Sequence, residues 1–429
     1  MTPSARCQAA IELLETIESS SRPADAILQS YFRKRRYAGG GDRRAIQSLV
    51  YAVLRKQAQL DWWCHRAGIA PTVRQRILAA LSFRIAWEGI RLGTVFAGDR
   101  YGARALDGAE KLRAEAWLHE TIENDEQPDD VRLNYPAWLN GAFSSNLNAN
   151  LEAELQALNS EATVDLRVNS LKTDRDTAIQ LLANAGLNAV PMKFAPNGIR
   201  LSKRRPFRHL QGFKDGLFEP QDEASQIAAE LVGAAPGDRV LDFCAGGGGK
   251  ALALAAVMEN RGQIVLHDVD EKRLAEAERR LERAGVTICE TREKASVIND
   301  EFDIVILDVP CSGSGVWRRN PETKWQITPT LFAQQTETQA AILAEAAHFV
   351  RPGGRLAYMT CSVLEAENKT RVDKFLRESP ISFNLITISK EITKMNGLRL
   401  DNAGETLQLT PQNHQTDGFF VALFERHSE

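Results

Sequence analysis

Beyond Pro220 the chain alternates apolar, β-branched-rich runs with stretches of helical spacing, and this alternation constrains the fold more than any other feature. The runs are RVLDFCAG, GQIVLHDV, FDIVILDVPC and GRLAYMTCS. Strands that are apolar without interruption are buried on both faces, which occurs in parallel sheets covered by helices on each side. The sequence therefore predicts a doubly wound α/β domain over residues 221–429. The last apolar run, DGFFVALFER, fits an antiparallel strand that closes the sheet.

Two further regions precede this domain. From about residue 5 to residue 120, apolar residues recur at spacings of three and four, as in AIQSLVYAVL, which predicts a helical bundle. The acidic segment ETIENDEQPDD has no apolar period and indicates a linker. Residues 131–220 mix β-prone runs such as TVDLRVN with one helical segment and predict a small α+β unit. The predicted domains are 1–130, 131–220 and 221–429, a division that 429 residues can accommodate.

Composition narrows the class of protein. With 43% hydrophobic and 25% charged residues the chain is an ordinary globular protein, and its formal net charge of -3 excludes a uniformly basic nucleic-acid binder. Its six cysteines lie far apart, so we expect neither a disulfide framework nor a bound metal. No signal peptide and no apolar run of membrane length occurs. We therefore expect a cytoplasmic protein without membrane association, and we expect a monomer.

A glycine-rich loop joins the first strand of the predicted sheet to a helix. It consists of Cys244, Ala245, Gly246, Gly247, Gly248, Gly249 and Lys250. Such a loop lets a ligand approach the backbone N–H groups at a helix N-terminus. A nucleotide phosphate loop would need Ser or Thr after Lys250, where this chain has Ala251. A dinucleotide and S-adenosylmethionine both fit the loop, and both fit Asp268 after the next strand as an acceptor for ribose hydroxyls. The glycines could instead form only a tight turn, with Asp268 capping the next helix.

Two cysteines follow the ends of two predicted strands. FDIVILD ends at Asp308 and leads into Cys311, and GRLAYMT leads into Cys361. Ligands bind beyond the carboxyl ends of strands in a doubly wound sheet, and these two strands are neighbours in its methyltransferase variant. Both thiols would then face one cleft. Either cysteine alone would fit a small buried hydrophobe, but their joint placement favours a site.

A pair of thiols with a carboxylate suits the methylation of carbon 5 of cytosine. That carbon becomes nucleophilic only after a group adds covalently to carbon 6, and a thiolate is the natural adding group. An acid that hydrogen-bonds the ring nitrogen stabilises the developing charge, and a base then removes the proton from carbon 5.

These motifs carry a family resemblance. LDFCAGGGGK, LHDVDEKRL, ILDVPCSGSGVWRRNP, YMTCSVLEAEN and DGFF resemble, in order, the motifs of the RsmB/Sun-type RNA cytosine-5 methyltransferases. Upstream, RVNSLKT and GLFEPQDEASQIAA resemble that family's lead-in, and GDRRAIQSLVYAVLRKQAQLDW resembles a NusB-type RNA-binding domain. The resemblance implies an all-α NusB-like N-terminal bundle, a small α+β unit, and a Rossmann-like methyltransferase domain with a mostly parallel seven-stranded sheet.

The resemblance also implies roles for the site residues. Cys361 would be the nucleophile, Cys311 would assist product release, and Asp308 would face both the cofactor and the base. Residues 244–250 and Asp268 would hold S-adenosylmethionine.

The chain departs from the family pattern at two places in the cofactor site. The family's loop has a proline where this chain has Gly247, so we expect a more flexible loop. The third cofactor carboxylate has no clean match, and Glu293 is the nearest candidate.

Basic residues gather in three segments that we expect to contact RNA. Residues 31–60 hold eight Arg and Lys side chains against Asp42 alone, and clustered cations release counterions from a phosphate backbone. Trp317 follows the Pro-Cys loop and could stack on a displaced nucleotide. The middle cluster, formed by Lys203, Arg204, Arg205 and Arg208, could also be an ordinary solvated face. The candidate RNA-binding residues are Arg35, Arg36, Arg43, Arg204, Arg205, Arg318 and Arg319.

The sequence therefore predicts an S-adenosylmethionine-dependent RNA cytosine-5 methyltransferase acting on 16S rRNA. The alternatives are a tRNA cytosine-5 methyltransferase and an inactive RNA-binding or ribosome-assembly factor on the same fold. The intact set of Cys311, Cys361 and Asp308 counts against an inactive factor. A small-molecule methyltransferase would leave the basic N-terminal segment unexplained.

Overall fold

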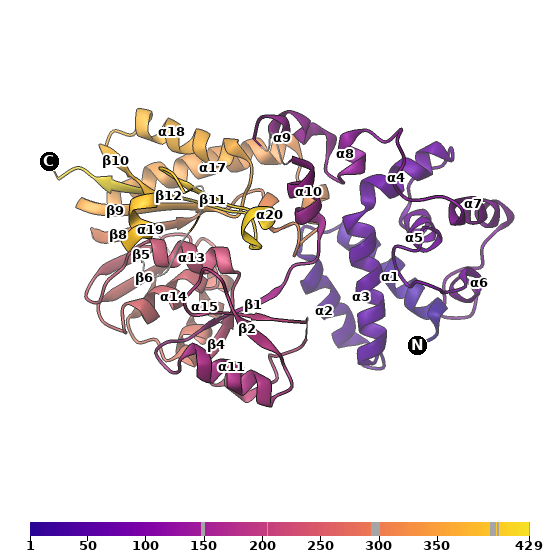
Figure 1. Cartoon of the computed structure of the whole chain (residues 1–429), viewed down its shortest axis with the longest axis horizontal. Coiled ribbons are helices and arrows are strands. Elements are labelled where there is room, and N and C mark those ends of the chain that lie inside the picture. Colours follow the sequence, from indigo (N-terminus) through magenta and orange to yellow (C-terminus); the bar gives the residue numbers. More distant parts are fainter. Residues whose placement is uncertain (147–150, 204, 293–300, 395–399, 401–402, 429) are drawn as a thin grey trace. The chain divides into compact units, whose positions relative to one another are not determined.

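A computed structural model describes residues 1–146, 151–203, 205–292, 301–394, 400 and 403–428 (Figure 1). Its contacts divide the chain into two compact units. The first, which we call the helical unit, is Met1–Ser160 together with Trp317–Pro329. The second, the catalytic unit, is Glu161–Val316 together with Thr330–Glu429.

The described residues of the helical unit form helices and no strand, as the spacing of apolar residues predicted. Its described helices are α1 (Pro3–Glu18), α2 (Ala24–Lys34), α3 (Gly40–Arg55), α4 (Gln57–Arg66), α5 (Val73–Ser82), α6 (Leu92–Val95), α7 (Gly108–Leu118), α8 (Asp129–Arg132), the 3₁₀ turn η1 (Ala137–Leu139), α9 (Asn140–Asn146), α10 (Leu151–Asn159) and α16 (Thr323–Gln326). Side chains cap the helix starts: Thr2 accepts the Ala5 N–H, and Asp107 accepts that of Glu110. Apolar faces of α1, α3 and α5 pack into one core, with Leu13, Leu49 and Ile77 fully buried.

The boundary predicted near residue 130 does not match the division of contacts, which falls at residue 160. The acidic run that suggested a linker is followed by residues that pack on the bundle. Asn134 is buried and its side chain donates to Gln59 Oε1 at 2.7 Å. The domain boundary near residue 130 stays a prediction.

The catalytic unit begins with a small antiparallel sheet in the strand order β2-β3-β1-β4. Its elements are β1 (Val164–Val168), α11 (Arg175–Asn184), β2 (Ala189–Pro191), β3 (Gly198–Leu201), α12 (Gln211–Lys214) and β4 (Phe218–Pro220). Leu166, Leu182 and Ile199 form the centre of its own core. This is the small α+β unit that the sequence predicted.

The main sheet follows, in the strand order β10-β12-β9-β8-β5-β6-β7, with β11 paired to β12. Its strands are β5 (Arg239–Asp242), β6 (Gln263–His267), β7 (Cys289–Arg292), β8 (Phe302–Asp308), β9 (Val350–Thr360), β10 (Phe383–Ile386), β11 (Leu407–Leu409) and β12 (Phe419–Arg426). The strands from β9 to β7 are parallel, and β12 is antiparallel to β9, as expected for a closing strand. The sequence predicted seven strands; β11, only three residues long, is the additional one.

Helices cover both faces of this sheet (Figure 1). They are α13 (Glu223–Leu231), α14 (Gly249–Val257), α15 (Glu271–Ala284), the 3₁₀ turns η3 (Ser314–Val316), η4 (Ala347–Phe349) and η5 (Glu365–Glu367), α17 (Pro329–Ala346), α18 (Lys369–Glu378), α19 (Ile388–Lys394) and α20 (Pro411–His414). Successive strand residues alternate between two cores. Ile304 and Ile306 of β8 pack with α13 and α14, whereas Val305 and Leu307 pack with α17 and α18. The uninterrupted apolar runs arise because neither face meets water.

Among the residues that the structure describes, no helix combines the length and the apolar character needed to cross a membrane.

Candidate active site

The predicted site residues come together at one edge of the main sheet. β5, β6, β8 and β9 are parallel neighbours, so their carboxyl ends lie at the same edge. β5 leads into the glycine loop, β6 into Asp268, β8 ends at Asp308, and Cys361 directly follows β9. The segments that carry the predicted chemistry are thus brought together by strand order.

The glycine loop is held by Asp268. The carboxylate accepts the Gly246 N–H at 2.7 Å on one oxygen and the Asp270 N–H at 2.9 Å on the other. Gly246 and Gly248 have φ angles of +53° and +74°, in the left-handed region that glycine tolerates best. The cap of α15 is Asp270, whose side chain accepts the Lys272 N–H, so Asp268 is not the helix cap. A carboxylate has further lone pairs, so Asp268 can still accept hydroxyl groups of a ligand.

Lys250 links the glycine loop to the end of β8. Its ammonium donates to Asp308 Oδ2 at 2.9 Å and to Ser225 Oγ at 2.8 Å, and it lies 4.7 Å from the centre of the Phe419 ring. The side chain is buried. The lysine therefore orients the Asp308 carboxyl, and it does not extend outward as a phosphate-binding lysine would.

Asp242, the last residue of β5, is a member of the site that sequence reasoning missed. It is fully buried, and neither carboxyl oxygen has a hydrogen-bond partner of normal geometry in the described part of the chain. Burial raises the pKa of Asp242 to about 7; the negative charges of Asp308 and Asp268 add to this rise, and Lys250 and the Ala251 N–H oppose it. The signal available in the sequence was a lone carboxylate at the end of an apolar strand, directly before the glycine loop.

The two cysteines lie side by side, with 3.3 Å between Cys311 Sγ and Cys361 Sγ. Each thiol is partly buried, and the Gly315 N–H donates to the Cys361 carbonyl at 3.0 Å. The hydrogen bond with Cys361 raises the pKa of the Cys311 thiol well above its usual value; burial and the charges of Cys361 and Glu367 raise it further. The adjacency that the strand order predicted is present.

Cys244, at the start of the glycine loop, differs from this pair. Burial raises the pKa of its thiol, and the charge of Asp242 adds to the rise. A thiol in such surroundings stays protonated and is a poor nucleophile.

Polar side chains that the sequence analysis did not single out connect the two cysteine loops. They are Ser312, Ser314, Gln339, Ser362 and Glu367. Two of the serines stand in PCSGSG, and Glu367 stands in YMTCSVLEAEN, so their only sequence signal was proximity to a cysteine.

Two predicted site residues lie outside the described residues: Glu293, the third cofactor carboxylate, and Arg204, in the middle basic cluster. Among the described residues, no group of His, Cys, Asp and Glu is arranged to hold a metal ion.

The predicted RNA-binding arginines have different environments. Arg36 and Arg205 are exposed. Arg35 lies 3.7 Å from the centre of the Tyr31 ring and pairs with Glu12, and Arg43 donates to the Ala38 carbonyl. Arg35 and Arg43 are therefore already engaged within the helical unit.

Trp317 and Arg318 correct the prediction for the third basic segment. Trp317 is 1% exposed and Arg318 is 6% exposed, so Trp317 has no free ring face on which a nucleotide could stack, and Arg318 is not a surface cation. Arg319 is partly buried. The segment Trp317–Pro329 belongs to the helical unit, where the Trp317 ring packs 5.9 Å from that of Phe143. Its neighbours are distant in sequence, so no local pattern signalled this burial.

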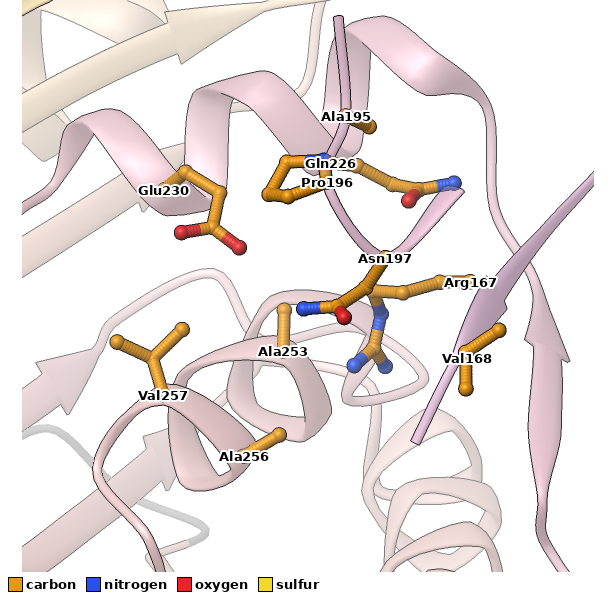
Figure 2. Close-up of a pocket in the computed structure, with 10 residues that line it drawn as sticks. All are labelled: Arg167, Val168, Ala195, Pro196, Asn197, Gln226, Glu230, Ala253, Ala256 and Val257. Carbon is orange, nitrogen blue, oxygen red and sulfur yellow. The ribbon is translucent and has the colours of Figure 1, made fainter. Parts of the chain in front are cut away.

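A pocket in the catalytic unit lies apart from these residues (Figure 2). β1 and the turn at residues 195–197 face α13 and α14 there, with Glu230 and Arg167 on opposite sides. Burial lowers the pKa of Arg167 to about 10 and raises the pKa of Glu230. None of the predicted cofactor or catalytic residues lines this pocket, so it is not the site described above.

Comparison with known proteins gives consistent matches over most of the chain. The family model for 16S rRNA methyltransferase RsmB/F matches residues 229–425, and that for the RsmF/B-like ferredoxin-like domain matches residues 135–208. The probable ribosomal RNA small subunit methyltransferase B of Synechocystis sp. is 30% identical over 410 residues, covering 90% of this chain and 91% of the relative.

Two solved structures are similar in fold. The crystal structure of PH0851 has a TM-score of 0.81 at 24% identity and covers 99% of both chains. That of NSun6 from Pyrococcus horikoshii with SFG has a TM-score of 0.61 at 20% identity, covering 68% of this chain and 98% of the other. Together with the sheet order, they establish a Rossmann-like methyltransferase fold.

Proposed function

Because the chain belongs to the family of 16S rRNA methyltransferases RsmB/F, we propose that it methylates carbon 5 of a cytosine in small-subunit rRNA through a covalent bond to Cys361. One observation carries this proposal beyond the family: the two thiols lie 3.3 Å apart at the ends of neighbouring strands. A reaction that adds one thiol to a base and then removes a proton from the adjacent carbon needs two such groups together.

S-adenosylmethionine fits the residues around the glycine loop. The loop leads directly into the N-terminus of α14, where a helix favours a negatively charged or polar ligand group, and Asp268, which binds the loop, keeps acceptor capacity. The carboxyl group of Asp242 is buried without a partner among the described residues, and a cation close to it would be stabilised. The fold neighbour NSun6 was crystallised with SFG, which supports a cofactor of this class. Such a cofactor supplies an electrophilic methyl group.

The protein side chains account for the remaining steps. Cys361 Sγ bonds to carbon 6 of the base, and the electron pair of the ring double bond becomes available at carbon 5. Asp308 hydrogen-bonds the ring nitrogen, with its carboxyl group oriented by Lys250. After methyl transfer, Cys311 releases its own proton to solvent and accepts the proton of carbon 5, the bond between carbon 6 and sulfur breaks, and the ring double bond re-forms.

RNA reaches this site as a single displaced nucleotide, because the atoms of a stacked base are inaccessible to a thiol. The helical unit provides the NusB-like RNA-binding surface, with Arg36 among its exposed cations, and Arg205 adds one from the catalytic unit. Arg35 and Arg43 support this surface through their contacts within the helical unit. In this proposal the enzyme acts as a monomer in the cytoplasm.

The product of the reaction tests this proposal. Incubation with labelled S-adenosylmethionine and small-subunit rRNA lacking the modification is expected to yield labelled 5-methylcytidine on nuclease digestion. Cys361→Ala is expected to reduce the rate by a factor of about 10⁴ or more, because it removes the nucleophile. Cys289→Ala, a partly buried thiol on β7, is the matched control and should methylate normally.

Two results would overturn the proposal. One is a labelled nucleoside other than 5-methylcytidine, and the other is full activity of Cys361→Ala. A parallel reaction with unmodified tRNA distinguishes the rRNA substrate from the alternative one.

A further inference from the structure

Glu367 lies between the two cysteine loops and is fully buried. Burial of a carboxylate is costly unless hydrogen bonds or a cation compensate it. No described Lys or Arg forms an ion pair with Glu367, so hydrogen bonds alone compensate its charge. A buried carboxylate that no cation neutralises, next to reactive groups, is a feature typical of functional sites.

Three donors converge on its two oxygens. The Ser312 N–H and the Gln339 side chain donate to Oε1 at 2.8 and 2.9 Å, and the Ser312 hydroxyl donates to Oε2 at 2.5 Å. All three groups act as donors, which suits a carboxylate that only accepts. Ser312 is the residue after Cys311, so Glu367 holds the backbone and the side chain adjacent to that thiol.

The same network reaches the second cysteine. The Ser312 hydroxyl lies 3.2 Å from the Ser362 hydroxyl, which lies 2.9 Å from that of Ser314. Because the Ser312 proton is directed to Glu367, its oxygen is left to accept from these neighbours. Ser362 directly follows Cys361, so each cysteine is adjacent to a serine in the network that Glu367 organises.

Glu367 also orients Gln339 of α17, and this side chain holds the residue that precedes Cys311. Gln339 of α17 donates both to Glu367 and to the Pro310 carbonyl, the latter at 3.0 Å. The residues on either side of Cys311 are therefore fixed directly or indirectly by one carboxylate. The loop has no strand or helix of its own at this point, so these bonds, together with the one from the Gln335 side chain to the Cys311 carbonyl at 3.3 Å, hold Cys311 in place.

We propose that Glu367 is a positioning residue that fixes Cys311 against Cys361 and, through its negative charge, keeps Cys311 protonated while Cys361 attacks the base. This inference rests on the proposed function for its catalytic consequence, although its effect on the thiol is independent of any substrate. Cys361 is then the thiol that attacks, and Cys311 acts as a base only after it has released its own proton.

The charged and titratable groups around Cys311 are consistent with a protonated thiol at this position. Cys361 follows β9, Glu367 lies in η5, and Tyr358 on β9 is influenced by the charge of Cys311. Cys361 and Glu367 both raise the pKa of Cys311, and the Gly313 N–H opposes this rise, whereas Arg371 of α18 lowers the pKa of Tyr358.

Glu367→Gln tests the proposal, because it keeps the size of the side chain but replaces one acceptor oxygen by a donor. Glu365→Gln is the matched control, since Glu365 is an exposed residue of the same 3₁₀ turn and loses the same charge. We expect kcat to fall about a hundredfold in Glu367→Gln, as for a misplacement of about 1 Å, with KM for RNA and affinity for S-adenosylmethionine unchanged. Glu365→Gln should leave all three quantities unchanged.

Thiol alkylation separates positioning from loss of folding and needs no RNA. In a Cys361→Ala background, the rate of Cys311 modification by iodoacetamide is followed against pH by peptide mass spectrometry. Glu367→Gln is expected to move the midpoint to lower pH by about one unit, a tenfold change in thiolate fraction. A change only in the plateau rate would report altered access to the thiol, not charge, and would contradict the proposal.

The two measurements also separate this inference from the proposed function. If neither wild type nor variant methylates RNA but the alkylation midpoint shifts, the proposed function fails and the effect of Glu367 on Cys311 stands. If Glu367→Gln matches Glu365→Gln in both kcat and alkylation midpoint, the inference is wrong whatever the reaction.

Discussion

At the scale of single residues, the chemistry of this site depends on carboxyl groups held in unusual surroundings. Asp242 has a raised pKa because it is buried near two other carboxyl groups, whereas Asp268 is stabilised by backbone N–H groups. Lys250 lies between the glycine loop and Asp308 and offsets part of the negative charge. Similar carboxyl groups thus take different roles according to burial and partners.

The raised pKa of Asp242 makes the stability of the protein depend on pH. Its folded pKa of about 7 exceeds that of an unfolded aspartate, so the folded state binds the proton more tightly. Proton binding therefore stabilises the folded state at low pH, and this stabilisation is lost as pH rises through 7. Between pH 5 and pH 8 we expect the free energy of unfolding of wild type to fall by about 2 to 3 kcal/mol relative to Asp242→Asn. Urea denaturation at several pH values measures this difference.

An exposed carboxylate of the same unit is the control for that measurement. Asp176→Asn on α11 should differ from wild type by an amount that does not vary with pH. A pH-independent difference between wild type and Asp242→Asn would show that Asp242 is ionised throughout this range, and its pKa would then not be raised by burial.

At the scale of elements, strand ends and tight loops create the site. Cys311 and Cys361 meet because β8 and β9 are adjacent, and this could be predicted from apolar runs and their order. The loop contacts could not be predicted in the same way. Gly315 of η3 approaches Gly418, whose N–H donates to the Gly315 carbonyl at 2.8 Å. Such a close approach depends on tertiary packing that no local pattern encodes.

Gly315→Ala tests the close contact between Gly315 and Gly418. A Cβ at position 315 would lie 2.1 Å from the Gly418 carbonyl oxygen, a backbone atom that cannot move away at low cost. Overpacking of this kind destabilises by about 1 to 3 kcal/mol, and it should also displace the Cys311 loop and lower methylation. Chemical denaturation and activity are compared with Gly404→Ala, where a Cβ meets nothing within 4 Å. Equal stability of the two variants would mean that the loops are not in close contact.

At the scale of the whole molecule, one segment connects the chemistry of the catalytic unit with the packing of the helical unit. Residues after Val316 enter the helical unit, where Lys324 is fully buried and donates to the Asn134 carbonyl at 3.0 Å. The Trp325 side chain donates to the Leu54 carbonyl at 2.8 Å. The segment begins only six residues after Cys311, so the bundle is joined to the catalytic loop by a short length of chain.

This arrangement explains which predictions succeeded. The helical bundle, the α+β unit and the parallel sheet follow from apolar periodicity, which reflects burial over many residues. The burial of Trp317 and the division of contacts at residue 160 could not be predicted, because both depend on partners far away in the sequence. Asp242 and Glu367 were missed because their roles depend on burial beside other charges, which a sequence does not display.

The central claim is that Cys361 forms a covalent bond to the base and that Cys311 is needed to release it. The most direct measurement is electrophoresis, under denaturing conditions, of Cys311→Ala incubated with unmodified small-subunit rRNA and S-adenosylmethionine. We predict a protein band shifted by attached RNA that survives denaturation and disappears in the double variant Cys311→Ala, Cys361→Ala. Absence of the shifted band while the variant still methylates RNA, or its persistence in the double variant, would contradict this claim.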